Sequence, residues 1–478
     1  MTNDLAARES NVTGHAGALK KELGLWDLIL TQIVFVVGGS WVGTAAKLGP
    51  SHLAYWLLAL LLFYVPQAAV VIYLNKRMPL EGGLYQWAKF GFNKFAGFMV
   101  AWNLWLLAIC VMAAIGLVVT TNISYAIGER ASWMPGNRWL VSAVSLGLII
   151  AMIAVSARGL SLGKWVHNAG GLIMLVTYAA LIALPFVSLA RGDLKRYQPL
   201  AIAAPSMGLL GINIFSKLAV GALAGFEYVA ILAGESRVPA RNIGRSVLIA
   251  APVIALMFIL GTSSVLVFAT DTNKIDLIGP VPQTLSIGFR SFGAAGIIVS
   301  VAILLLAARA IAVMSIYFAG TSRLPMVAGW DNLLPAWFSR LHDRWKTPVN
   351  SIIFVGAVTV IFALASLIGV GPQEAFQLAD NAAGVFYGIA YLVMFAIPLI
   401  GLRELRDGAP LWLRIAAVSG FVVTLLYIVF STFPIVEVVN SYWFAAKIVG
   451  VTLITNLIGV AVFVAGSKRA AATTKHFP

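Results

Sequence analysis

The sequence predicts an all-α protein that crosses a membrane about twelve times. Of its 478 residues, 60% are hydrophobic and only 11% are charged, and its mean hydropathy is +0.92. Soluble proteins usually carry about 25% charged residues. The basic residues behind the net charge of +15 lie mostly in short segments between long apolar runs, where they orient a protein in its membrane. A lipid bilayer is therefore the expected environment, and nucleic acid is not expected as a partner.

Long apolar runs follow one another along the whole chain. With a cytoplasmic N-terminus, most Lys and Arg residues fall on the cytoplasmic side, as the positive-inside rule requires. The protein is therefore expected in the cytoplasmic (inner) membrane with both termini, residues 1–24 and 467–478, in the cytoplasm. The predicted spans are residues 25–48, 52–74, 95–127, 138–156, 168–190, 211–233, 246–269, 291–318, 350–370, 376–401, 411–431 and 442–466.

The first run is interrupted by glycine. Residues 38–43 read Gly-Gly-Ser-Trp-Val-Gly, inside a stretch that carries no charge between Asp27 and Lys47. Glycine weakens a helix, and backbone groups freed at this depth are tolerated only where they line a cavity or are packed in protein. An interrupted first span therefore indicates a transporter's binding site. The alternative is that these glycines only let a neighbouring helix approach closely.

The sixth run is softened in the same way. Gly221, Gly225 and the small residues between them occupy its middle, and Glu227 follows at once within the apolar stretch. An intramembrane carboxylate is costly and is by default a functional candidate. We therefore assign Glu227 to gating or coupling. The alternative is a structural Glu that hydrogen-bonds the broken backbone.

The two interrupted spans predict an internal repeat. They are separated by an odd number of spans, so the two halves of the chain enter the membrane from opposite sides, as an inverted-topology repeat requires. Residues 25–190 and 211–401 are the expected repeats of five spans each. Residues 411–466 would then form two extra C-terminal spans outside the repeats.

Several motifs resemble, in order along the chain, those of the amino acid–polyamine–organocation (APC) superfamily of secondary transporters. Gly39-Ser-Trp-Val-Gly43-Thr44-Ala45 is similar to the first-span motif Gly-x-x-x-Gly-x-Gly, with Ala45 where the last glycine is usual. The resemblance covers nearly the whole ten-span core. It implies the LeuT-like fold with broken helices one and six, and transport of an amino acid or a closely related amine by alternating access. The other motifs are Pro79-x-x-Gly82-Gly83-x-Tyr85, Gly225-Phe226-Glu227, Glu235-Ser-Arg-Val-Pro239-Ala-Arg241, Ser322-Arg323, Asp331-Asn-Leu-Leu-Pro335 and Thr347-Pro348-Val349-Asn350.

The resemblance also implies where a substrate would bind. The substrate carboxylate would meet the free N–H groups of Gly43, Thr44 and Ala45, together with the Thr44 hydroxyl. Unpaired N–H groups at the positive end of a half-helix do attract anions. The amino group would meet the carbonyls of Trp41 in span one and of Gly221 and Ala224 in span six. The substrate-binding set is Gly39, Ser40, Trp41, Gly43, Thr44, Ala45, Gly221 and Ala224.

One departure from the family concerns coupling. Several members carry a lysine in span five that stands in for a sodium ion, and here its position would lie near Met174. No charged residue occurs between Ala169 and Ala190. Arg309, in the middle of span eight, is the candidate replacement. The alternatives are a clamp for the substrate carboxylate, a partner of Glu227, or a structural arginine bonded to carbonyls.

Two further charges lie within spans near the expected site. Lys217 precedes Glu227 on the outer side of the break, and either faces the outer vestibule or reaches to the interface. Asp380 lies in the outer part of span ten, where it would gate the vestibule, bind an amine, or serve only as a cap. Both are assigned to gating or coupling.

The leading function is a secondary active transporter, permease or exchanger, for an amino acid or a closely related amine. A proton or a counter-substrate is the candidate coupling partner. A polyamine or small-amine permease is the main alternative, and a channel or a membrane-embedded enzyme is less favoured. The five histidines form no metal motif, and a phosphate-binding loop with the Lys-Ser/Thr ending is missing. We therefore expect neither a cofactor nor an enzyme activity.

Overall fold

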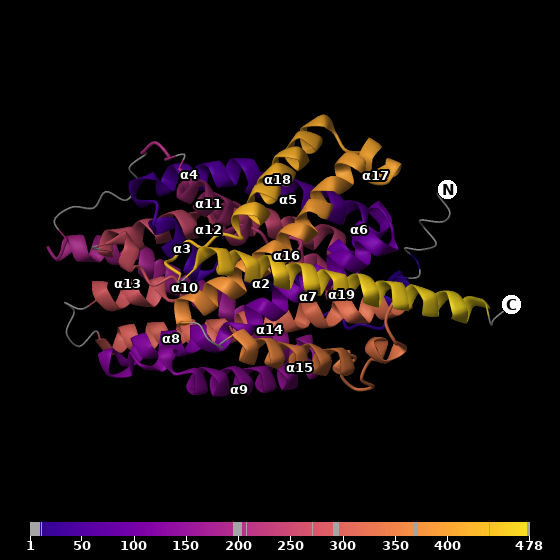
Figure 1. The fold of residues 1–478 in the computed structure, drawn as a ribbon, viewed down its shortest axis with the longest axis horizontal. Coiled ribbons are helices and arrows are strands. Elements are labelled where there is room, and N and C mark those ends of the chain that lie inside the picture. Colours follow the sequence, from indigo (N-terminus) through magenta and orange to yellow (C-terminus); the bar gives the residue numbers. More distant parts are fainter. Residues whose placement is uncertain are drawn as a thin grey trace.

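A computed structural model of the chain describes residue 10 and residues 12–194, 203–206, 208–269, 271–289, 296–366, 371–438 and 440–475. The described part is helical, and most of its helices run along the long axis of the molecule (Figure 1). In the first half of the chain the elements are α2 (Leu25–Val36), α3 (Gly39–Ala46), η1 (Gly49–Ser51), α4 (His52–Ala59), η2 (Leu60–Tyr64), α5 (Val65–Arg77), α6 (Leu84–Gly91), α7 (Lys94–Ala113), α8 (Ile115–Ile127), η3 (Glu129–Ala131), η4 (Met134–Gly136), α9 (Arg138–Ala157) and α10 (Leu160–Ala190). In the second half they are α11 (Leu209–Ser216), η5 (Lys217–Ala222), η6 (Tyr228–Glu235), α12 (Pro239–Phe268), η7 (Thr272–Lys274), α13 (Pro280–Gly288), α14 (Gly296–Trp330), η9 (Ala336–Ser339), α15 (Val349–Ser366), α16 (Pro372–Ile400), α17 (Arg403–Asp407), α18 (Leu411–Phe430) and α19 (Ser441–Lys475).

The apolar runs fold as expected for a multi-pass membrane protein. Within the described residues, nine helices are long and apolar enough to cross a membrane, and the bent pair of α2 and α3 passes the same test together. Two shorter apolar helices, Leu209–Ala222 and Val349–Ala365, lie where the sixth and ninth spans were predicted. Each predicted span thus has a helical counterpart, although the sixth and ninth are shorter than a full crossing.

Several helices are longer than the apolar runs that predicted them. The eighth run was expected to end near residue 318, but α14 continues to Trp330, and α19 continues to Lys475 through the predicted C-terminal tail. Apolar runs mark only the hydrocarbon part of a helix, whereas the backbone hydrogen bonds continue through the interface. Both described ends of the chain lie at the same end of the molecule (Figure 1). We call this end the terminus face.

The first span is broken at Val37 and Gly38. Helix α2 ends at Val36, both break residues have extended backbone, and α3 leaves at an angle of 44° to α2. The break is shorter than the glycine-rich stretch of residues 38–43 that predicted it, because the helix resumes at Gly39. Gly39 and Gly43 both lie within α3, so Gly38 is the one glycine of this stretch that lies in the break itself.

The sixth span is broken over Leu223–Glu227. A π-helical turn, η5, ends at Ala222, and a 3₁₀ helix, η6, begins at Tyr228. Gly225 has φ +140°, a conformation that L side chains rarely adopt, and a Cβ there would lie 2.8 Å from the Phe35 ring. This break therefore depends on glycine, as the sequence predicted.

The first half of the broken first span packs against two long helices, one from each half of the chain. Helix α2 packs against α10 and α12, while α7 packs against α16. Helix α19 is peripheral, because only 11% of its apolar membrane-spanning stretch is buried inside the protein. The division into two inverted repeats, residues 25–190 and 211–401, stays a prediction.

Candidate functional site

The Trp41 indole lies between the two breaks. A Cβ on Gly38 would come within 2.6 Å of the indole from the first break, and a Cβ on Gly221 within 2.6 Å from the sixth span. Both positions must be small because the indole occupies the space beside them. Trp41 therefore connects the two interruptions by direct packing.

A cavity of about 180 Å³ opens beside these breaks. Its wall includes five of the predicted binding residues, Gly39, Ser40, Trp41, Gly221 and Ala224, and two of the predicted coupling residues, Arg309 and Asp380. It extends away from the terminus face, because its lining reaches Asn122 near the far end of α8 and Pro280 in α13. The rest of the lining comprises Phe35, Val36, Gly38, Leu107, Cys110, Val111, Ala114, Ile115, Val118, Ile278, Val281, Pro282, Leu306, Ala310, Val313, Tyr317, Phe376, Ala383, Gly384, Tyr387 and Tyr427.

Arg309 binds the broken end of α2. Its Nη2 donates to the carbonyl of Val34 at 3.1 Å and makes a shorter hydrogen bond to the carbonyl of Val37. These carbonyls are at the last turn of α2, where the break removes their usual intrahelical donors. A cation at the negative end of a helix is also favoured by the helix dipole. The same guanidinium lines the cavity, so it faces both the broken backbone and the space for a ligand.

The free amides of the first span are not those expected from the family motif. Gly43, Thr44 and Ala45 lie inside α3, where N–H groups bond to carbonyls one turn back, and none of the three lines the cavity. The amides without an intrahelical acceptor are those of the first turn, at Gly39 and Ser40. The free amides thus lie about one turn nearer to the break than the amides expected to meet a substrate carboxylate.

Gly43 has a packing role in this structure. A Cβ on Gly43 would lie 2.6 Å from the Pro280 Cβ and 3.3 Å from the Ile275 side chain. Close approach to a neighbouring segment was the alternative interpretation of these glycines, and it is the one observed at Gly43.

The expected carbonyl of Trp41 is likewise inside a helix. Trp41 belongs to the first turn of α3, so its carbonyl faces the N–H of Ala45. The carbonyls of Gly221 and Ala224 instead lie at the C-terminal end of a half-helix, where intrahelical donors run out. The second break therefore offers acceptors for a cationic group.

Glu227 lies fully buried behind the cavity wall and is the N-cap residue of η6. Its carboxylate accepts a hydrogen bond from the Tyr387 hydroxyl at 2.5 Å and a shorter one from the Tyr391 hydroxyl. The Tyr391 oxygen in turn accepts from the backbone N–H of Gly225 at 3.0 Å. The hydrogen bonds of Arg309 and Glu227 thus go to different groups, and a pairing of these two charges, one of the alternatives for Arg309, is not the arrangement observed.

Lys217 and Asp380 approach each other at the outer part of the site. Lys217 is only 2% exposed, and its Nζ donates to the Asn381 side-chain carbonyl at 2.5 Å. Asp380, the next residue to Asn381, lines the cavity and interacts electrostatically with Lys217. Lys217 therefore reaches neither the outer vestibule nor the interface, and it partly balances the charge of Asp380.

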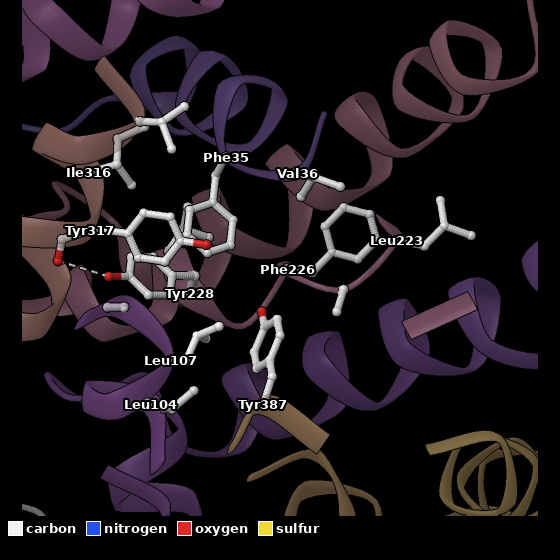
Figure 2. Close-up of a cluster of buried hydrophobic side chains, with 14 of the residues drawn as sticks. Phe35, Val36, Leu104, Leu107, Leu223, Phe226, Tyr228, Ile316, Tyr317 and Tyr387 are labelled. Carbon is white, nitrogen blue, oxygen red and sulfur yellow. Dashed lines mark hydrogen bonds between the residues drawn. The ribbon is translucent and has the colours of Figure 1, made fainter. Parts of the chain in front are cut away.

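Phe35, Tyr317 and Tyr387 line one wall of the cavity, and Figure 2 shows the cluster of buried side chains to which they belong. Phe35 stacks on Tyr228 with a centroid distance of 4.2 Å and lies 4.9 Å from Tyr317, whose carbonyl accepts from the Tyr228 hydroxyl. Tyr387 comes from α16 on the other side of the group. The sequence analysis missed these tyrosines. The four-residue spacing of Tyr387 and Tyr391, which places both on one face of α16, was the available signal.

The terminus face below this wall is closed by buried charges. Arg323 donates to both carboxylate oxygens of Glu235, at 3.0 and 2.8 Å. Glu81 accepts from the N–H of Gly234 at 2.5 Å. Burial and the nearby charge of Glu235 together raise the pKa of Glu81 to about 8, although the charge of Arg323 opposes the rise. A neutral Glu81 therefore suits this site better than a charged one.

The N-terminal segment closes over the same charges. The N–H groups of Glu22 and Leu23 donate to the Glu235 carbonyl at 2.9 and 3.0 Å, and the Arg237 N–H returns a bond to Leu23. Val12, Ala16 and Leu19 bury their side chains, and His15 stacks on Trp330 at 5.2 Å. Access to the cavity from the terminus face is thus blocked in this structure.

Comparisons with known proteins identify relatives along the whole core. The model of a family described as amino acid permease matches residues 23–469. The "Uncharacterized transporter lpg1691" of Legionella pneumophila is 24% identical, with 79% of this chain and 80% of that protein covered. The "Probable agmatine/putrescine antiporter AguD" of Lactococcus lactis is 21% identical, with 89% and 88% covered. Among solved structures, MhsT in complex with L-phenylalanine matches with a TM-score of 0.61 at 15% identity, covering 86% of this chain and 98% of that one.

Proposed function

Because this chain belongs to the amino acid permease family, we propose that it carries α-amino acids and recognises their carboxylate with Arg309 and the first amides of α3. The chain is a multi-pass membrane protein and a secondary transporter of amino acids or related amines. Which of these it carries depends on the groups that line its cavity. The observation that carries the proposal is the position of Arg309, which lines the cavity while it binds the broken end of α2.

The two ends of an amino acid would meet opposite ends of broken helices. The amides of Gly39 and Ser40 lie at the positive N-terminal end of α3, and a guanidinium nearby offers further donors to a carboxylate. The carbonyls of Gly221 and Ala224, at the negative end of η5, suit an ammonium group. Trp41 would form the apolar surface between the two ends.

The remaining charged residues would control the transport cycle. Glu227 holds the start of η6 and the tyrosines of α16 together, so its protonation would weaken this connection. Asp380 lines the cavity, and the buried Lys217 behind it interacts with its charge, so this pair would control access. A proton or a counter-substrate would then complete the cycle. The inner membrane, with both termini in the cytoplasm, is the location that the distribution of basic residues favours.

Exchange in proteoliposomes tests the proposal. Vesicles are loaded with a mixture of unlabelled amino acids, and uptake of labelled amino acids is measured against competitors matched to each one. The competitors are the free amino acid, its methyl ester and the amine left after decarboxylation. We expect saturable uptake that the free acid inhibits and that the ester and the amine inhibit at least about tenfold less, because they lack the charge that Arg309 would bind.

Two other outcomes of this assay would support a different function. Stronger inhibition by the amine than by the amino acid would favour an amine permease, the function in the printed name of the Lactococcus relative. Flux that rises linearly with concentration and never saturates would favour a channel. Either outcome contradicts the carboxylate site.

A further inference from the structure

A second cavity lies on the outer surface of the helix bundle, far from the breaks along the chain. It has a volume of about 250 Å³ and lies between α7, α14, α15 and α19. No charged side chain lines it in the part of the chain that the structure describes. We call it the apolar groove, and its lining is Phe98, Ala101, Trp102, Trp105, Leu324, Pro325, Ala328, Leu334, Phe338, Phe354 and Val462.

The walls of the apolar groove are held in place by specific contacts. Trp105 stacks on Phe354 of α15 at 5.5 Å with an angle of 6° between the rings. The Trp102 indole N–H donates to the carbonyl of Thr455 in α19 at 2.9 Å, and Asn103 donates to the Asn456 side chain at 2.8 Å. These contacts between helices therefore fix the shape of the apolar groove in the folded protein.

The lining determines what can fill the apolar groove. Water or a polar solute would find almost no hydrogen-bonding partner there. Apolar cavities of about 150 Å³ stay dry and bind small hydrocarbons such as benzene, so a larger one suits a segment of hydrocarbon chain. Helix α19, which forms one wall, has little buried surface, so the apolar groove lies on the side of the bundle that faces lipid.

Basic residues lie close in sequence to residues that line or border one end of the apolar groove. Lys94 precedes Phe95, which packs on Phe463 of α19 at 5.2 Å. Figure 1 shows that α19 ends at the terminus face.

Two more basic residues lie near the same end. Gly466 packs against the backbone of Leu333, and Lys468 follows it by two residues. Arg340 lies two residues after Phe338, a lining residue. Lys94, Lys468 and Arg340 are all exposed. Two acidic residues are close in sequence to these positions: Asp331, which is paired with Lys89 at 2.5 Å, and Asp343, which is exposed three positions after Arg340.

We propose that the apolar groove binds one acyl chain of an anionic phospholipid, whose headgroup phosphate is held by Lys94, Arg340 and Lys468. A hydrocarbon tail matches the lining, and a negative headgroup matches the basic residues at the membrane surface. Leu324 and Pro325 place the lipid against α14, the helix that also carries Arg309. The bound chain thus fills the space between α14 and α19 and supports α14 where proline interrupts its hydrogen bonds.

The first test locates the lipid chemically. The purified full chain is reconstituted with phosphatidylglycerol that carries a photoreactive diazirine on one acyl chain, and the cross-linked peptides are mapped by mass spectrometry. We expect adducts in the segments around Trp102, Phe354 and Val462. Matched phosphatidylcholine should label these segments roughly tenfold or more less, because neutral lipid lacks the attraction to the basic residues. Equal labelling by the two lipids, or labelling elsewhere only, overturns the proposal.

Variants separate the headgroup from the tail. Removing the charges in Lys94→Gln/Arg340→Gln/Lys468→Gln should abolish the preference for phosphatidylglycerol. A control triple variant on the same face, Lys76→Gln/Arg237→Gln/Arg241→Gln, should keep it. The variant Ala328→Phe, which fills the apolar groove, should lose the labelling while it still elutes as a single species.

Two results would contradict the proposal in this second test. If both triple variants lose the preference equally, general surface charge explains it. If lipid labelling is replaced by cross-links between two copies of the chain, the apolar groove is a subunit contact. Neither result bears on the substrate site, because uptake in the exchange assay is measured separately.

Discussion

Replacement of Arg309 by methionine tests the central element of the proposed site. The Arg309→Met side chain has a similar length but neither charge nor donors. It leaves the carbonyls of Val34 and Val37 without the hydrogen bonds that Nη2 now provides. It also removes the cation that lines the cavity. We expect weaker binding of amino acids and slower transport.

The magnitude follows from the kind of contact that is lost. A hydrogen bond to a charged group contributes about 1.5–3 kcal/mol. Since about 1.4 kcal/mol corresponds to a factor of ten, loss of one such contact to the substrate carboxylate should weaken affinity roughly 10- to 150-fold. The affinity for an amine without a carboxylate should change by less than about threefold, because that ligand never makes the contact.

The assay is equilibrium binding of a labelled amino acid to purified protein, followed by exchange and net uptake in proteoliposomes. Arg309→Lys keeps a cation but not the planar fork of donors, so it should recover part of the affinity. Lys447→Met is the matched control. It removes a cation within the last span, where Lys447 is half-exposed and 3.7 Å from Glu374, and it should change neither affinity nor rate.

Different results would refute different parts of the reasoning. If amino acids and amines lose affinity equally, Arg309 does not bind the carboxylate. If affinity and exchange survive while net uptake comes to depend on an added inorganic cation, Arg309 serves as the fixed cation that replaces a coupling ion. If affinity, exchange and net uptake all match the parent, Arg309 is a structural residue for the end of α2.

Three further substitutions test the surrounding structure. Glu227→Gln should change the rate of transport and its pH dependence more than affinity, since it mimics the protonated carboxyl group beside the break; an unchanged pH profile of uptake would exclude a proton role. Gly225→Ala should lower the free energy of unfolding by roughly 1–3 kcal/mol, because φ +140° is strained for alanine and the added Cβ meets Phe35 at 2.8 Å; an unchanged melting temperature would show that the break relaxes freely. Glu81 has a folded-state pKa raised to about 8, so the folded protein holds its proton more tightly, and the stability this provides is complete below the ordinary pKa of about 4.3 and is lost as the pH rises toward 8. The melting temperature should therefore fall over this range in the parent and fall less in Glu81→Gln, and parallel curves for the two proteins would contradict the assignment.

The span pattern could be predicted because it depends on local sequence alone. A run of about 20 apolar residues is long enough to cross the bilayer whatever its neighbours do. The two breaks were also predictable, since clustered glycines weaken a helix locally. The exact limits were not. Whether Gly39 and Gly43 are helical depends on what packs beside them, and Pro280, which contacts Gly43, is more than 200 positions away in the sequence.

The residues that line the candidate site were predictable in type and only partly in position. Arg309 and Asp380 could be chosen because charges are rare within spans, and the structure places both at the cavity. The hydrogen-bonding partners of the charged residues could not be predicted from the sequence. The contact of Arg309 with Val37 and that of Glu227 with Tyr391 join residues from distant helices, and neither pair shares any local pattern.

Each break is held by a charged residue within the spans. The end of α2 exposes carbonyls at a negative helix end, and Arg309 supplies the cation there. Glu227, the N-cap residue of η6, makes no capping hydrogen bond with its side chain, and its carboxylate instead accepts from the Tyr387 and Tyr391 hydroxyls of α16. The first break is therefore compensated by charge, whereas the sixth span is tied to the tenth.

A rearrangement of either half-helix must therefore exchange these contacts. Trp41 packs on Gly221 across the two breaks, and the Tyr391 hydroxyl links Glu227 to the Gly225 amide. Because these contacts join the first, sixth and tenth spans, one break cannot reorganise without disturbing the other. A substrate that replaces part of them, with its carboxylate at Arg309 and its ammonium at Gly221, would lower the cost of moving both half-helices together. That differential contact is what a ligand needs in order to shift a transporter between its two states.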